Sequence, residues 1–310
     1  MCWNDKKFDR AFGSVAGFAL LAGLLTGCAN PAPRETEYVP HSGPATVLSS
    51  VAVWADIAKA IGGTDVTTRA IIAGPGRDPH SYEASVRDQL AVNKADITVA
   101  NGADYDTFFS KLVNARPAIN SITNLNLAHQ LRSNSANPHF WYSVRTVVRA
   151  VQVLSNAERM AMQTQQQAID IQDRAAAYDG ELQKLIARED SFKVANTASP
   201  KTALLTESFA AYLLADLGIK DVTPASFRNA VEQEQDASPA VMAQMRNLLA
   251  NHKISVLVLN RQTAGAQTTQ LENWAKSAGV PILYWSELLP ANTTYLEWMS
   301  QNLSQIEGIK

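Results

Sequence analysis

The feature that most constrains the fold is a long segment without helix breakers in the middle of the chain. Residues 163 to 188 contain no proline, and their only glycine is Gly180. At 1.5 Å a residue, such a segment forms a helix about 40 Å long, which is the width of a domain. Its apolar residues recur at spacings of four and three positions, as on one continuous helix face; they are Ile171, Ala175, Tyr178, Leu182 and Leu185. We expect a helix that braces two lobes, in preference to an isolated coiled-coil seam.

The segments on either side of this helix alternate short apolar runs with helical patterns. Before it, we expect strands at 46–53, 65–72 and 97–101 and helices at 54–61, 85–94, 105–113 and 144–154. After it, we expect strands at 202–206, 254–259 and 281–285 and helices at 208–217, 239–251, 268–278 and 294–306. Ser155 with Glu158 fits a capping box at the start of the region that leads into the long helix, and Thr294 with Glu297 forms a second one at the start of the last helix.

Alternation of this kind is typical of βαβ units and a mainly parallel sheet. We therefore predict an α/β protein of two lobes, each a mainly parallel sheet flanked by helices, joined by the long bracing helix. We assign residues 45–155 to a first lobe, 156–190 to the linking helix and 191–310 to a second lobe.

The first residues have the features of a targeting segment. Three basic residues up to Arg10 precede an apolar stretch from 11 to 25, which is shorter than the roughly 20 residues of a transmembrane helix. The stretch ends in Leu25-Thr26-Gly27-Cys28, which resembles a bacterial lipobox. We expect residues 1–27 to be a signal peptide and Cys28 to be the acylated first residue of the mature protein. A plain secretory signal is the alternative.

Residues 28–44 have the composition of a tether between lipid and domain. They contain four prolines and few large apolar residues, which indicates disorder. Removing residues 1–27 takes away three positive and two negative charges, so a net charge of −2 becomes −3. This balance argues against a nucleic-acid partner. Because the mature chain keeps only one cysteine, it cannot form an intramolecular disulfide.

Two histidines occupy similar frames made of an acid or its amide, a proline, the histidine, one spacer and an aromatic residue. The frames are Asp78-Pro79-His80-Ser81-Tyr82 and Asn137-Pro138-His139-Phe140-Trp141. Proline fixes its own φ and extends the residue before it, so both histidines should be presented from stiff turns. Because imidazole is a common metal ligand, the pair indicates a metal site.

Two glutamates stand just past the ends of predicted strands in the second lobe. Glu207 follows the strand at 202–206, and Glu287 follows the strand at 281–285. In open α/β sheets, ligands bind beyond the carboxyl ends of the strands. We therefore expect both side chains to face a cleft between the lobes. For Glu207, an ordinary acid attracted to a helix N-terminus is the alternative.

The remaining histidines and the acids of the first frame have less specific explanations. His41, His129 and His252 lie in polar surroundings and are expected to be surface residues. Asp78 and Glu83 either orient His80 through its second ring nitrogen or serve as a turn cap and a solvated charge.

Together these motifs resemble the metal-binding solute-binding lipoproteins of zinc and manganese ABC transporters, which are periplasmic proteins of the zinc-uptake type. The resemblance extends from Val47 to Ile306. Its most specific matches are the segment 76–83, Lys94-Ala95-Asp96-Ile97, Asn101-Gly102, the second histidine frame, Glu207 with Tyr212 and Gly218, and Tyr295, Trp298-Met299 and Asn302.

The resemblance implies one metal ion bound by two histidines of the first lobe and two residues of the second. Carried over, these are His80, His139 and Glu207, with a fourth position that is usually aspartate in the family. Strict register places Ser286 there, but a neutral hydroxyl is a poor ligand for a divalent cation. We therefore expect Glu287 to be the fourth ligand.

The resemblance also implies a carrier with no catalytic activity, anchored by lipid at the extracytoplasmic face of the cell membrane. It would deliver zinc or manganese to an ABC transporter permease, and we expect a monomer. Glu207 in place of a histidine favours harder ions without separating the two metals. The other classes considered are a metal-binding surface adhesin or interaction lipoprotein and a metallohydrolase. The sequence has no HExxH and no Gly-x-Ser-x-Gly motif, which argues against the hydrolase.

The lipobox gives the first prediction. Replacing the acylated residue, Cys28→Ala, should release the protein from the membrane fraction, because the lipid is the expected membrane attachment. Fractionation followed by immunoblotting measures this, and an unchanged distribution would argue against lipidation.

Overall fold

The computed structural model of the protein describes residues 43–79, 81–116, 123–133, 136–233, 235–251, 253–260, 262 and 265–309. The predictions for the signal segment, Cys28, the tether up to residue 42, His80 and His252 lie outside these residues. Every helix in the described part of the chain is too short or too polar to span a bilayer.

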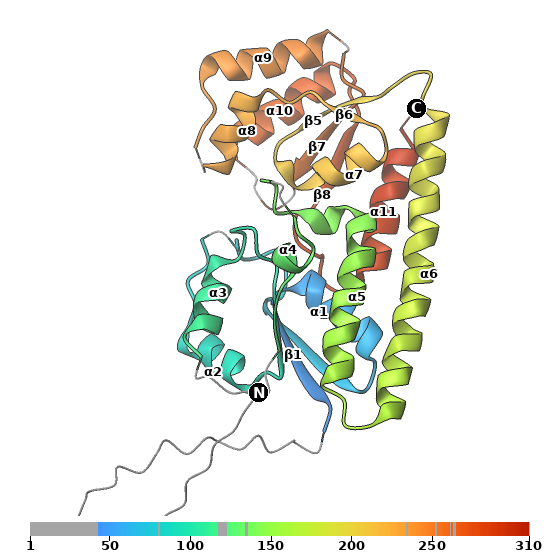
Figure 1. The fold of residues 1–310 in the computed structure, drawn as a ribbon. Helices are drawn as coiled ribbons and strands as arrows, with labels where there is room; N and C mark the ends of the chain where they lie inside the picture. The colour runs from blue at the N-terminus through green and yellow to red at the C-terminus, as the bar shows by residue number, and fades with distance from the viewer. Residues whose placement is uncertain are drawn as a thin grey trace, which may run out of the picture. The chain divides into compact units, whose positions relative to one another are not determined.

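Two four-stranded parallel sheets form the framework of the two lobes (Figure 1). The first sheet has the order β2-β1-β3-β4 and is built from β1 (Ala45–Val51), β2 (Val66–Ile72), β3 (Ile97–Ala100) and β4 (Thr123–Asn126). The second has the order β6-β5-β7-β8 and is built from β5 (Thr202–Leu205), β6 (Lys220–Asp221), β7 (Val256–Asn260) and β8 (Ile282–Trp285). The order of strands along the chain is therefore the same in both lobes, and the predicted α/β fold class is confirmed.

Helices connect the strands of each lobe. In the first lobe they are α1 (Ala52–Gly62), α2 (Val86–Lys94), α3 (Thr107–Asn114), α4 (Leu127–Gln130), the 3-10 turn η1 (Phe140–Tyr142) and α5 (Val144–Met160). In the second lobe they are the 3-10 turn η2 (Ser208–Ala210), α7 (Ala211–Asp216), α8 (Ala225–Glu232), α9 (Pro239–Ala250), α10 (Ala266–Ser277) and α11 (Tyr295–Glu307).

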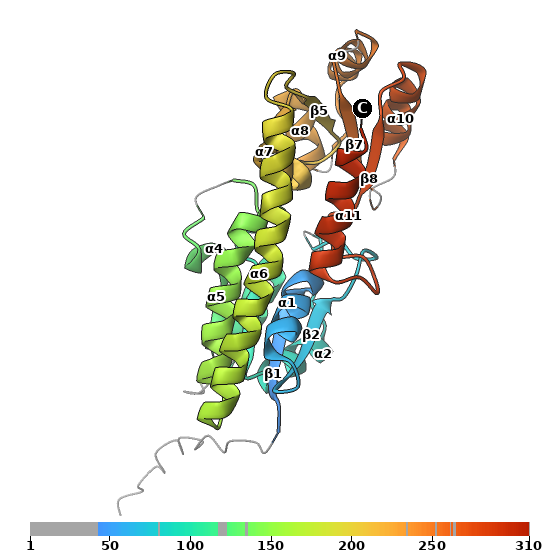
Figure 2. The ribbon, with the colours of Figure 1, turned by 90° about the vertical axis from the view of Figure 1, so that its right-hand side faces the viewer.

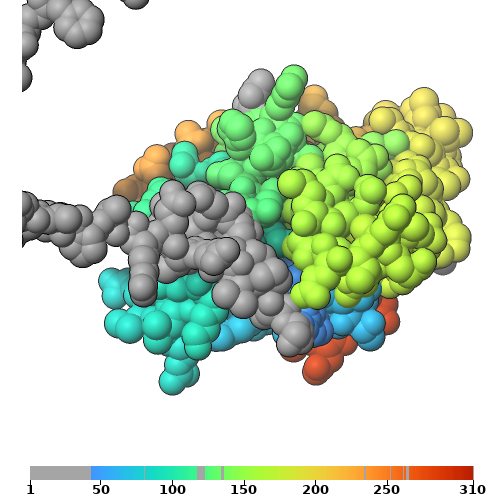
Figure 3. Space-filling model, turned by 60° about the horizontal axis from the view of Figure 1, so that its bottom comes forward, coloured from blue at the N-terminus to red at the C-terminus, as the bar shows by residue number. Residues whose placement is uncertain are grey.

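The long helix α6 runs from Gln165 to Ala195, 31 residues, between the two lobes in sequence. The five apolar residues predicted to share a face are all buried. Helix α6 packs against α5 and α1 of the first lobe and α11 of the second, and Figure 2 shows it running beside all three helices. Seen with the bottom of Figure 1 turned forward, the yellow-green residues around the junction of α5 and α6 form one continuous surface (Figure 3).

One predicted helix start is wrong and another is confirmed. Ser155 and Glu158 are buried inside α5, because the apolar stripe of that helix continues to Ala157. The capping box that starts α6 is instead formed by Thr164 and Gln167. At α11, the predicted box is present, with Thr294 and Glu297 bonding each other's main-chain N–H groups.

The second sheet has two buried faces of different kinds. Side chains of successive strand residues point to opposite faces. Leu257 and Leu259 of β7 pack with α8, α9 and α10 in a core of their own. Val256 and Val258 belong to a larger core that is shared with the first lobe through η1, α5, α6 and α11. A continuous apolar core therefore joins the two lobes.

Two buried carboxyl groups lie on the paired helices α5 and α6. Glu158 is 1 % exposed and Glu189 is fully buried. Neither has a hydrogen-bond partner among the described residues, although Arg145 Nε lies 3.9 Å from Glu189 Oε2. Burial raises the pKa of Glu158 to about 9 and that of Glu189 to about 8. Both groups are therefore protonated in the folded protein at neutral pH.

These groups predict that the protein is less stable at alkaline than at acidic pH. Above the ordinary pKa near 4.5, the unfolded chain ionises both carboxyls while the folded protein keeps them protonated. Unfolding then releases protons, so the free energy of unfolding falls as the pH rises toward 9. Glu158→Gln combined with Glu189→Gln should raise the melting temperature by several degrees at pH 8 and change it little at pH 5. The matched control is Glu181→Gln at an exposed position of α6, and an equal effect in both variants would contradict the explanation.

Candidate metal centre

His139 occupies the N-cap position of η1. Pro138 precedes it, and the main-chain N–H of His139 donates to Asn137 Oδ1 at 3.0 Å. The same oxygen is 2.7 Å from the ring atom Nδ1. This contact favours a proton on Nδ1, so that Nε2 is the ring atom directed toward the second lobe. The imidazole is 7 % exposed and packs edge-on against the rings of Tyr105 and Trp141.

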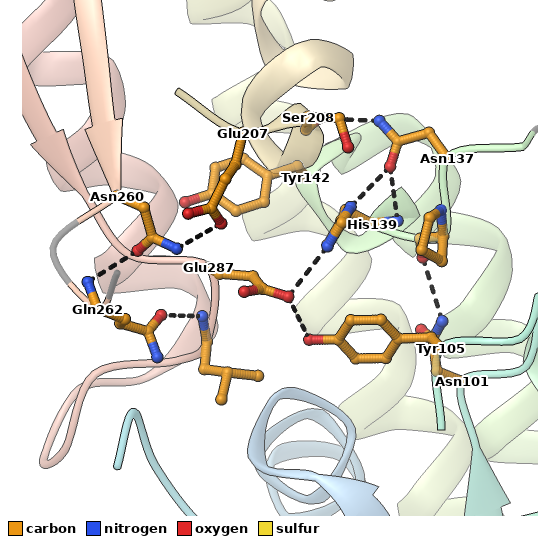
Figure 4. Close-up of polar contacts among 12 residues, drawn as sticks. Asn101, Tyr105, Asn137, His139, Tyr142, Glu207, Ser208, Asn260, Gln262 and Glu287 are labelled. Atoms are coloured by element: carbon orange, nitrogen blue, oxygen red, sulfur yellow. Dashed lines mark hydrogen bonds and ion pairs between the residues drawn. The ribbon is translucent and has the colours of Figure 1, made fainter. Parts of the chain in front are cut away.

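Glu287 follows β8 and is brought to His139 from the second lobe. Its Oε1 atom lies 3.0 Å from His139 Nε2 and accepts a hydrogen bond from Tyr105 Oη at 2.7 Å. Figure 4 shows its carboxylate pointing toward both side chains. Burial and the neighbouring carboxylate raise the pKa of Tyr105 well above its ordinary value, so the hydroxyl remains a donor.

The main chain around Glu287 is held by aromatic side chains of η1. Trp141 Nε1 donates to the Glu287 carbonyl at 3.2 Å, and Tyr142 Oη donates to the Ser286 carbonyl. Ser286 thus contributes its main-chain oxygen to the contact between the lobes. Of the two candidates for the fourth ligand, Glu287 is the one whose side chain contacts His139.

Glu207 follows β5 and lies near Glu287 in the same view (Figure 4). Its side chain makes no capping hydrogen bond to η2, although the residue occupies the N-cap position. Instead, Oε2 accepts a hydrogen bond from Asn260 Nδ2 at 2.7 Å. The carboxylate of Glu207 therefore bonds the end of β7 and does not cap η2 by a hydrogen bond.

A chain of amide contacts links the loops that follow β5, β7 and β8. Asn260 Oδ1 accepts from the Gln262 N–H at 3.0 Å, and Gln262 Oε1 accepts from the Leu288 N–H at 2.9 Å. Gln262 Nε2 also donates to the Pro75 carbonyl of the first lobe at 3.1 Å. The second-lobe loops thus contact the segment that precedes the first histidine frame.

The structure therefore brings His139 and Glu287 into contact and places Glu207 at the same junction of the lobes. The other predicted ligand, His80, lies outside the described residues. Within the described ranges, no group of three or more His, Cys, Asp or Glu side chains is arranged to hold a metal ion. Near His80, Asp78 accepts a hydrogen bond from Ser81 Oγ at 2.8 Å, as in a capped turn.

Three site residues were not singled out from the sequence. Tyr105 falls in a predicted helix, and Asn260 and Gln262 lie outside the predicted motifs. The Asn101-Gly102 motif indicates the turn that precedes Tyr105. Asp106 accepts the N–H groups of Asn101 at 2.6 Å and Gly102 at 2.9 Å, which fixes the turn that presents Tyr105.

Sequence comparison relates the chain to proteins that bind metal ions. The iron-binding protein YfeA of Yersinia pestis is 26% identical over 220 residues, which is 68% of each chain. The zinc-binding protein TroA of Treponema pallidum (strain Nichols) is 26% identical over 179 residues, and the chain spans only 56% of that relative's length.

Solved structures share the fold at lower identity. The periplasmic zinc-binding protein TroA of Treponema pallidum superposes with a TM-score of 0.71 at 20% identity, over 86% of this chain and 99% of that one. A manganese-bound mutant of a periplasmic metal-binding protein from Candidatus Liberibacter asiaticus gives a TM-score of 0.67 at 18% identity, over 86% and 100% of the two chains. These similarities confirm the architecture of two α/β lobes with a long helix.

Residues 47–308 match the family described as zinc-uptake complex component A, periplasmic. The match includes both sheets, the long helix and every predicted ligand. The chain belongs to this family of periplasmic metal-binding proteins.

Proposed function

We propose that the protein captures one divalent transition metal ion between its lobes and delivers it to the permease of an ABC transporter. The observation that most directly supports this is the contact between His139 Nε2 and Glu287 Oε1 at 3.0 Å, made across the lobes in a buried position. Two donor atoms bound to one ion at about 2.1 Å in tetrahedral geometry lie about 3.4 Å apart. The two side chains need to separate by only a few tenths of an ångström to accept an ion.

The proposed ligands are His80, His139, Glu207 and Glu287. Two neutral imidazoles and two carboxylates cancel the charge of a divalent ion, which matters because an uncompensated charge in a closed site is costly. Catalytic sites keep a position open for water or substrate, whereas four protein ligands fill a tetrahedral shell. This ligand set suits a carrier better than a metallohydrolase.

Zinc and manganese are the proposed ions. Imidazole and carboxylate ligands suit both, and in a given site the affinity order favours zinc. The second carboxylate, Glu207, favours harder ions. The relatives named above are described as binding iron, zinc and manganese, which are different ions in different proteins.

The proposed location is the extracytoplasmic face of the cell membrane. The family is periplasmic, and a lipid on Cys28 would keep the protein near its permease. We propose that the carrier works as a monomer, because its ligands all come from one chain.

The assignment of the fourth ligand gives a prediction. Glu287→Ala should weaken zinc binding by at least about 100-fold, because it removes a charged ligand and leaves His139 without its partner across the lobes. Ser286→Ala is the matched control and should change the Kd little, because the Ser286 contact is made by the main chain. Isothermal titration calorimetry measures both, and the reverse order would reassign the ligand.

Metal removal tests the function itself. The chelated protein should stay folded by circular dichroism and rebind one equivalent of zinc or manganese, because its core is formed without metal. Metal at 1,000 times its Kd should then add about 4 kcal/mol to the free energy of unfolding. His80→Ala and His139→Ala should each abolish tight binding. Loss of the fold on chelation would instead indicate a structural metal, as in an adhesin or interaction lipoprotein.

A further inference from the structure

The side-chain amide of Asn137 is in contact with both lobes at once. Its oxygen accepts the N–H of His139 at 3.0 Å and lies 2.7 Å from the imidazole Nδ1. Its nitrogen donates to the main-chain carbonyl of Ser208 in the second lobe at 2.8 Å. Figure 4 shows Asn137 between these two groups. Both ends of the amide are therefore used, one by each lobe.

Ser208 directly follows Glu207, so this contact is made to the main chain one residue after the second-lobe ligand. The far end of the Glu207 side chain is held by Asn260 at 2.7 Å. The hydrogen bond to the Ser208 carbonyl holds the main chain just after the residue from which that side chain starts. The path from His139 through Asn137 and Ser208 to Glu207 connects a ligand of one lobe to a ligand of the other.

We propose that Asn137 is a positioning residue whose amide sets the spacing between His139 and Glu207 before the ion arrives. The inference rests on the proposed function and deepens it, because it assigns preorganisation of the site to a group that does not bind the metal. Orientation of a ligating histidine by a neighbouring acceptor is general. In addition, the amide nitrogen of the same Asn137 side chain donates a hydrogen bond that ties this histidine to the opposite lobe.

The two hydrogen bonds of the Asn137 side chain, to His139 and to Ser208, form a bridge between the lobes. This bridge explains why residue 137 is an asparagine. The first frame has Asp78, whereas the second has an amide. An aspartate at 137 could still accept from His139, but it would place a carboxylate oxygen against the Ser208 carbonyl with no hydrogen between them. It would also add a negative charge beside a site that already contains two carboxylates. Only the amide serves as acceptor and donor together.

The test distinguishes two roles of Asn137: bridging the two lobes, or only orienting the His139 ring. Asn137→Asp keeps the acceptor and loses the donor, whereas Asn137→Ala loses both. If the bridge positions the ligands, both variants should raise the calorimetric Kd for zinc by about 10–100-fold. If only orientation matters, Asn137→Asp should bind zinc as tightly as the wild type, which would overturn the proposal.

Tyr212→Phe is the matched control. Tyr212 Oη donates to the main-chain carbonyl of Asn137 at 2.9 Å, so this variant loosens the same segment across the same lobes without touching the amide. Its Kd should stay within about twofold of the wild type. A loss as large as that of Asn137→Asp would show that general stability of the segment, and not the amide, determines binding.

A second readout uses metal-free protein and distinguishes failure of this inference from failure of the proposed function. In nuclear magnetic resonance spectra, the carbonyl carbon of Ser208 should shift in Asn137→Asp while His139 keeps its proton on Nδ1. An unchanged Ser208 signal would overturn the bridge whether or not metal binds. Absence of metal binding by the wild type, with the Ser208 shift present, would overturn the proposed function alone.

Discussion

The docking of the segment from Asn137 to Ser143 onto the second lobe is the constraint on which the site depends. In sequence the segment belongs to the first lobe, yet its polar groups bond the second lobe along its length. Besides the bonds from Asn137, Trp141 and Tyr142, Ser143 Oγ donates to Asp216 at 2.9 Å, and Tyr295 Oη donates to the Trp141 carbonyl at 2.7 Å. His139 is thus held against the acids of the second lobe by its neighbours.

Much of the fold was predictable because its central strands are apolar and its long helix has one buried face. Two of the four edge strands, β4 and β6, were not predicted, since β4 has a single buried residue and β6 has only two residues. The cap at Ser155 was mistaken because a local pattern cannot reveal that Glu158 is packed against Gly62 of another helix.

The site was predictable to the extent that it lies in sequence-local frames or at strand ends. The proline frames point to His139, and the strand ends point to Glu207 and Glu287, as proposed ligands. The residues that bond these side chains are distant in sequence and meet them only in the folded protein, so sequence spacing does not reveal them. Tyr105 meets Glu287 from 182 positions away, and Asn260 reaches Glu207 from 53. The frame that contains Asn137 is visible in the sequence, but the contact of Asn137 with Ser208 depends on how the two lobes pack together.

The apolar core shared by the lobes has a consequence for how the molecule comes apart. Val256 and Val258 of the second sheet pack into the same cluster as Trp54 of the first lobe and Leu182 of α6. Neither lobe could separate without exposing that surface to water, at a cost of roughly 25 cal/mol for each Å² of apolar area. The two halves should therefore melt in one cooperative transition rather than as independent domains.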